Sequence, residues 1–170
     1  MTKMLASFAV GGLALLLIGA PIPGPQTPVL GQAPPRVRWQ ITAEASARAE
    51  DRSRITLRGN GTFAPGRRDE TTGGGTWSLT NASEEIAGSG TYTVTELLSW
   101  TEAPGGFGDT RAGLAALRIR YSDGGEGVLV VSCHLVGTPD SVFEGILASK
   151  GFVQFWNREI NGTLFTLVRE

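Results

Sequence analysis

Few side chains in this sequence are suited to acid–base chemistry, because it contains only one His and one Cys. His134 needs a carboxylate within hydrogen-bond reach to act as a general base, and Glu96 or Glu144 would supply one. Tyr92 belongs to the same alternating segment as Glu96 and adds a hydroxyl group. Glu96, Glu144, His134 and Tyr92 are therefore the candidate catalytic residues.

A structural role for these residues is the competing interpretation. A lone His is more often a satisfied structural residue than a catalyst. Strand alternation points Cys133 away from His134, which argues against a Cys–His nucleophile pair. One His and one Cys leave no zinc site, and no glycine motif of the nucleotide-binding type joins a strand to a helix. We expect no metal and no cofactor.

Glu96 is the carboxylate that alternation places in an unusual position. It shares a predicted strand face with Tyr92 and Trp100, so in a barrel it would point into the lumen and need a hydrogen-bonding partner. The predicted ligand-binding set is Trp77, Tyr92, Glu96, Trp100 and Tyr121. The alternative is that the strand twists or bulges, so that Glu96 reaches a wet barrel mouth and the aromatic residues are ordinary core.

These side chains depend on a framework organised around residues 127–136, the densest apolar run outside the N-terminus. Its β-branched residues and the Gly-Thr-Pro-Asp sequence that follows favour a strand over a helix. Val128 and Val130 fall on one face, and Leu129 and Val131 fall on the other. A strand that is apolar on both faces is predicted to have a filled interior on one side and something packed outside it on the other.

Further strand candidates recur along the chain with turn signals between them. They cover residues 37–43, 54–63, 75–80, 89–100, 114–121 and 163–168, and residues 143–156 form another strand that is interrupted near residues 149–151. Residues 43–50 have a helical composition or continue the first strand, and residues 65–74 are predicted to be a polar turn. The fold class is therefore all-β, a single antiparallel β-barrel of about eight strands, with a β-sandwich as the alternative.

The N-terminal part of the chain has a different composition. Lys3 precedes an uncharged apolar run over residues 4–18, which is too short to span a bilayer comfortably and is typical of an export signal. We interpret residues 1–20 as a signal peptide or N-terminal anchor, residues 21–35 as a Pro/Gly-rich linker and residues 36–170 as the β-barrel domain. We expect export to the periplasm or the outside of the cell, with membrane attachment only through an uncleaved N-terminus.

Charge is unevenly distributed along a chain of formal net charge −1. Eight Arg lie between residues 34 and 68, and the remainder is acidic. Such asymmetry can mark a polyanion-binding face, but these Arg alternate with apolar residues as on the solvated face of an ordinary strand. We expect no nucleic-acid partner.

Residues 88–156 resemble proteins of the dirigent and allene-oxide-cyclase-like barrel group. The resemblance lies in the short strands, the Gly-rich turns and a Phe-Glu-Gly segment followed by Lys-Gly-Phe. It implies an eight-stranded barrel around an apolar cavity, and no catalytic signature of those families carries over residue by residue.

Three functions fit these observations. The leading expectation is a non-enzymatic exported barrel with a small apolar ligand in its lumen. The second is a barrel-type lyase or isomerase that pairs Glu96 or Glu144 with Tyr92 or His134. The third is a structural or envelope-interaction domain whose interior is filled by side chains.

Overall fold

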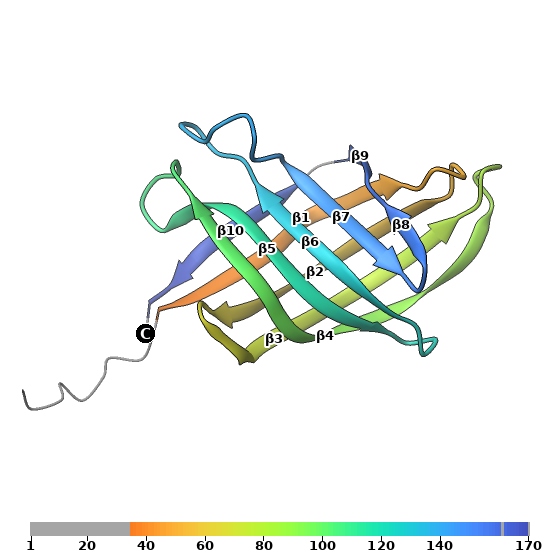
Figure 1. Cartoon of the computed structure of the whole chain (residues 1–170), viewed down its shortest axis with the longest axis horizontal. Coiled ribbons are helices and arrows are strands. Elements are labelled where there is room, and N and C mark those ends of the chain that lie inside the picture. Colours follow the sequence, from red (N-terminus) through yellow and green to blue (C-terminus); the bar gives the residue numbers. More distant parts are fainter. Residues whose placement is uncertain (1–34, 161, 170) are drawn as a thin grey trace, which may run out of the picture. The chain divides into compact units, whose positions relative to one another are not determined.

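The computed structural model describes residues 35–160 and 162–169, and within them the chain is all-β (Figure 1). The predicted all-β antiparallel fold is confirmed. Ten strands follow one another: β1 (Arg36–Arg48), β2 (Arg54–Ala64), β3 (Arg67–Thr80), β4 (Ile86–Ala103), β5 (Thr110–Tyr121), β6 (Glu126–Cys133), β7 (Gly145–Lys150), β8 (Val153–Phe155), β9 (Asn157–Ile160) and β10 (Thr163–Val168).

The structure decides the conformation of three segments that the sequence analysis singled out. The segment of helical composition continues β1 as far as Arg48. The predicted polar turn is wrong, because β3 begins at Arg67 and its polar first half is largely exposed. The interrupted strand is confirmed as the hairpin of β7 and β8, and β9 follows it. The export signal and most of the linker lie outside the described residues.

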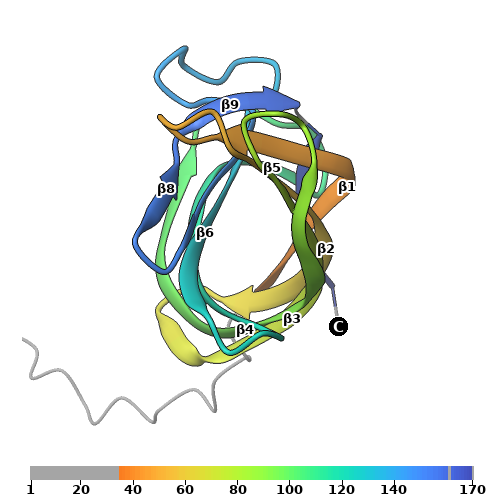
Figure 2. The same ribbon diagram turned by 90° about the vertical axis from the view of Figure 1, so that its right-hand side faces the viewer.

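Consecutive strands from β1 to β8 pair as antiparallel neighbours, and β9 pairs with the far end of β1. The sheet curves into a partial ring because β10 pairs with both β1 and β5 (Figure 2). Closure against β5 involves only two residue pairs, Phe165 with Arg111 and Thr166 with Thr110. Among the described residues, no helix is long and apolar enough to cross a membrane.

The hairpins alternate between two ends of the barrel (Figure 1). The Lys150 end carries the turns after β1, β3, β5 and β7. The Phe107 end carries the turn after β2, the loops after β4 and β6, the start of β1 and the end of β10. A residue in or near one of these turns therefore lies at the Lys150 end or at the Phe107 end of the barrel.

Side chains from nearly every strand meet inside the ring and form one apolar cluster. Its largest fully buried members are Trp39, Phe63, Tyr121, Phe155 and Phe165. β6 contributes Leu129 and Val131 to this interior. As the alternation predicted, Cys133 is buried with them while His134 is not. Burial raises the pKa of the Cys133 thiol to about 11, so the thiol is a core hydrophobe rather than a nucleophile.

A run of glycines lets the largest interior side chain lie against the sheet. Gly61 of β2 pairs directly with Gly73 of β3, and the buried indole of Trp39 covers both. A Cβ atom at Gly61 would collide with the carbonyl oxygen of Thr72 and lie 2.7 Å from the Trp39 Nε1 atom. The missing side chains therefore provide the space that the indole occupies.

We expect Gly61→Ala to lower the free energy of unfolding by about 1–3 kcal/mol, because the added methyl group overpacks a rigid backbone contact. Gly88→Ala is the control, since its Cβ would meet only the ring edge of Trp77, at 3.1 Å. Chemical denaturation of both variants checks this. Equal losses in the two variants would contradict a special role for the glycine pair.

Candidate functional site

Glu96 does not face the interior, contrary to the sequence prediction. β4 carries two β-bulges against β5, between Val94 and Glu96 and between Leu97 and Ser99. The first bulge shifts the alternation by one residue, so Leu97 is buried in place of Glu96. The Glu96 carboxylate lies outside the barrel, 3.2 Å from Arg68 and 3.1 Å from Arg118. A catalytic carboxylate that points into the lumen is therefore ruled out at this position.

The second bulge restores the original alternation, and Trp100 turns back toward the core. Its ring packs against Phe63 and Phe165, with ring centroids 5.2 and 4.8 Å apart, at the Phe107 end. The predicted ligand-binding set is therefore divided. Glu96 lies outside and Trp100 lies near one end, whereas Trp77, Tyr121 and Tyr92, which is opposite Tyr121 in the pairing of β4 with β5, lie together toward the other end. These residues do not converge on one pocket.

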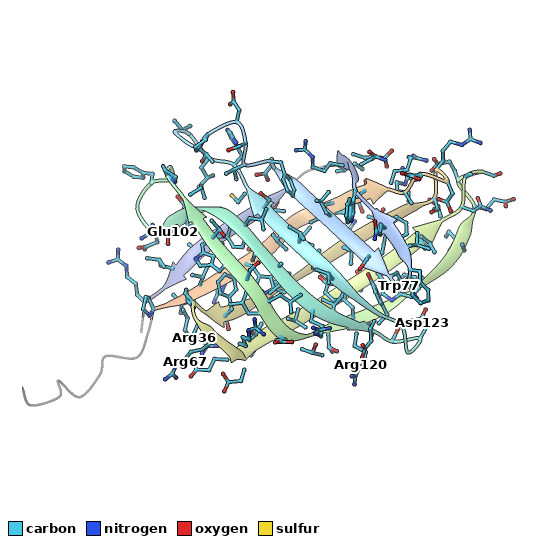
Figure 3. The ribbon with its side chains drawn as sticks, viewed as in Figure 1. Arg36, Arg67, Trp77, Glu102, Arg120 and Asp123 are labelled. Carbon is cyan, nitrogen blue, oxygen red and sulfur yellow. The ribbon has the colours of Figure 1, made fainter. Side chains whose placement is uncertain are left out.

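Trp77 and Tyr121 form an aromatic pair that a lysine covers at the Lys150 end, where Figure 3 labels Trp77 and Asp123. The Lys150 ammonium group lies 4.7 Å from the Trp77 ring centroid and 4.9 Å from that of Tyr121, and it forms an ion pair with Asp123. The hydrogen bond from Lys150 lowers the pKa of the Asp123 carboxyl group. The Tyr121 hydroxyl donates to the carbonyl oxygen of Ser149 at 2.8 Å. Each of these polar groups has a partner within the protein, so the cluster offers no free reactive group, and Trp77, Asp123 and Lys150 line a hollow of about 430 Å³ at this end.

His134 and Glu144 do come together, but through the backbone. The Glu144 carboxylate accepts the backbone N–H of His134 at 2.7 Å, the backbone N–H of Thr163 at 2.9 Å and the Thr163 hydroxyl at 2.9 Å. The His134 Nδ1 atom donates to the carbonyl oxygen of Val142 at 2.7 Å, because a carbonyl oxygen can only accept. Carboxylate and imidazole therefore do not form an acid–base pair. Glu144 joins the end of β6 to the start of β10.

Tyr92 lies inside the barrel, and its hydroxyl is one of several buried polar groups without a hydrogen-bond partner among the described residues. The Nε1 atom of Trp39 is another. The Tyr92 hydroxyl lies against Gly59, two residues from the Gly61 that Trp39 covers. Burial raises the pKa of the Tyr92 hydroxyl, so it remains protonated.

The arginine-rich first part of the domain pairs with carboxylates across the sheet. Arg48 lies 2.6 Å from Glu159 and 3.0 Å from Glu84, and Arg58 lies 2.8 Å from Glu44. Arg36 and Arg67 both contact Glu70. The charge asymmetry along the sequence is therefore cancelled locally on the folded surface.

Comparison of the chain with protein-family models, with curated proteins and with solved structures finds no match in any of the three. The resemblance to the dirigent and allene-oxide-cyclase-like group stays a prediction. Within the described part of the chain, no group of three or more His, Cys, Asp or Glu residues could hold a metal ion.

An exposed apolar surface with two hollows lies outside the barrel, around Trp156. Its side chain is 63% exposed and forms a ridge between two hollows. The first hollow, of about 420 Å³, is almost wholly apolar and is lined by Val128, Val130, Leu147, Ala148, Ser149, Gln154 and Trp156. The second, of about 480 Å³, adds charge and is lined by Ala49, Glu50, Asp51, Phe152, Val153, Gln154, Trp156 and Asn157. We call this surface the Trp156 face.

Sequence reasoning missed the Trp156 face, although two signals pointed toward it. Phe155 and Trp156 are consecutive, so alternation requires one of them to face outward, and Phe155 is the buried one. The apolar outer face of β6 predicted that something would pack outside, and Val128 and Val130 are only partly covered. Lys150 was also missed, although it is the only Lys beyond Lys3 in an Arg-rich chain.

Two matched substitutions separate the structural carboxylate of Glu144 from the carboxylate of Glu96 outside the barrel. We expect Glu144→Gln to cost about 1–3 kcal/mol of unfolding free energy, because an amide cannot accept hydrogen bonds at both oxygen positions. Glu96→Gln removes only solvent-exposed ion pairs and should cost at most about 1 kcal/mol. Urea denaturation of both variants measures the difference. A larger loss for Glu96→Gln would contradict these assignments.

Proposed function

We propose that this protein is a non-enzymatic interaction domain of the cell envelope, which binds a partner protein through the Trp156 face. The supporting observation is the double-sided apolar character of β6 and β7. Leu129 and Val131 supply the core, while Val128, Val130 and Leu147 line an apolar hollow on the outside. Exposed hollowed apolar surface of this kind is typical of a binding site, because water contact with it is unfavourable.

The location of the polar groups argues against an enzyme. Glu96 is paired with two arginines outside the barrel, and Glu144 holds backbone N–H groups. The two candidate carboxylates therefore have structural partners and face no common space. A catalytic site needs convergent groups around a position for the reacting atom, and the proposed catalytic set lacks that geometry.

The two hollows beside Trp156 suggest the chemistry of the partner. An apolar side chain fits the hollow over β6 and β7, where Trp156 would supply an aromatic anchor. Glu50 and Asp51 line the other hollow, so a basic residue or a hydrogen-bond donor fits there. We therefore propose an extended protein segment that carries an apolar residue near a cationic one.

A small ligand in the lumen is the second candidate, and one observation favours it. The Tyr92 hydroxyl and the Trp39 Nε1 atom are both buried donors without a partner among the described residues. A ligand that carries a hydrogen-bond acceptor would satisfy them. Against this, apolar side chains fill the space around them, and the hollows described above lie on the outside of the barrel.

Photo-crosslinking in the host tests the proposed interface. A photoreactive phenylalanine at position 156 should give a defined crosslink to another protein, and the same group at the exposed Thr93 on β4 should not. Val130→Glu should abolish the crosslink without lowering the melting temperature by more than a few degrees, because its side chain lines the hollow rather than the core. A crosslink at both positions, or only to a second copy of this chain, would overturn the proposal.

Tyr92→Phe distinguishes the filled interior from a ligand-binding lumen. If the hydroxyl has no partner, its removal should leave the free energy of unfolding unchanged or raise it by about 1–3 kcal/mol. The measurement is a denaturation curve of protein purified from its own host. A clear loss of stability would mean that a bound molecule accepts a hydrogen bond from the hydroxyl, which would support the luminal ligand instead.

A further inference from the structure

We infer that the Phe107 end of the barrel contacts a lipid bilayer through two apolar loop tips. Phe107, in the loop between β4 and β5, is 92% exposed, and Val136, in the loop between β6 and β7, is 97% exposed. The two loops are joined, because the Gly106 N–H donates to the carbonyl oxygen of Val136 at 3.3 Å. Both side chains therefore project from one connected tip.

A hydrogen-bonded turn holds Phe107 in this position. Its backbone N–H donates to the Thr110 hydroxyl at 2.8 Å, and its carbonyl oxygen accepts from the Thr110 N–H at 3.0 Å and the Thr110 hydroxyl at 2.7 Å. Because these backbone groups are satisfied within the turn, moving the tip out of water leaves them paired. A backbone segment can enter lipid only if its N–H and C=O groups are hydrogen-bonded within the protein.

The position of this tip relative to the first strand identifies the bilayer as the occupant. The Leu167 N–H donates to the carbonyl oxygen of Asp109 at 2.8 Å, and Leu167 pairs with Val37 near the start of β1. The chain that precedes β1 therefore joins the domain beside the Phe107 tip. That part of the sequence contains the uncharged apolar run over residues 4–18. β1 begins at the end that carries Phe107, and two weak membrane anchors in one chain reinforce each other.

The Phe107 end and the Trp156 face differ in surface shape. The Phe107 end presents two protruding side chains, whereas the Trp156 face has hollows that suit a protein segment. The nearby cations are neutralised, because Arg111 pairs with Glu102 and Arg169 pairs with Asp109. We therefore expect a mainly apolar contact that changes little with salt concentration.

Site-specific fluorescence of the full chain tests the inference. Phe107→Cys and, as the matched control, Phe152→Cys place one thiol on an exposed Phe at each end of the barrel. The native Cys133 is buried and does not compete for labelling. Each variant carries an environment-sensitive dye and is reconstituted with vesicles of phosphatidylcholine and phosphatidylglycerol.

The dye at position 107 should shift to the blue and be quenched by lipids with brominated acyl chains, while the dye at position 152 stays in water. Adding Val136→Asp to the Phe107→Cys variant should weaken the lipid contact of the tip by about tenfold, because an apolar anchor is replaced by a charge. Equal spectra at both positions would overturn the inference. A blue shift at position 107 without vesicles would also overturn it, since protein would then cover the tip.

Discussion

The curved sheet is held as a barrel because β10 is bonded on both of its sides. On one side it pairs with β1 from Arg36 to Ile41. On the other it has two residue pairs with β5, and its first residue, Thr163, bonds to Glu144 and to the carbonyl oxygen of Ser132 at 2.6 Å. No backbone ladder joins β10 to β6 in the described residues, so the side-chain hydrogen bonds of Glu144 and Thr163 complete this seam. The enclosed core depends on these few contacts.

The ring of strands is filled by side chains, and this determines where binding can occur. The candidate carboxylates are used in ion pairs outside or in the seam, and Lys150 covers the aromatic pair at one end. The apolar surface that is not used in the core is therefore found outside, on the Trp156 face and at the Phe107 tip. Under the proposals made above, these two surfaces contact different partners, a protein segment and a lipid bilayer.

Alternation along single strands predicted much of this arrangement. It correctly divided β6 into two apolar faces, with Leu129 and Val131 together in the core and Val128 and Val130 together on the outside. It was wrong in β4, because a bulge depends on pairing with β5 and leaves no local mark in the sequence around Glu96. The role of Glu144 was not predictable for the same reason. Its partners lie 10 and 19 residues away and meet only after the ring closes.

The pairing of the first strand with the last also affects how the chain folds. Arg36 is opposite Val168, so the contact that completes the ring spans almost the whole domain. Contacts between residues so distant in sequence form slowly, since the intervening chain must first lose its conformational freedom. Until then, β1 has an unpaired edge that can bind other strands and aggregate. A newly made molecule is therefore most vulnerable in the interval before β10 has been synthesised.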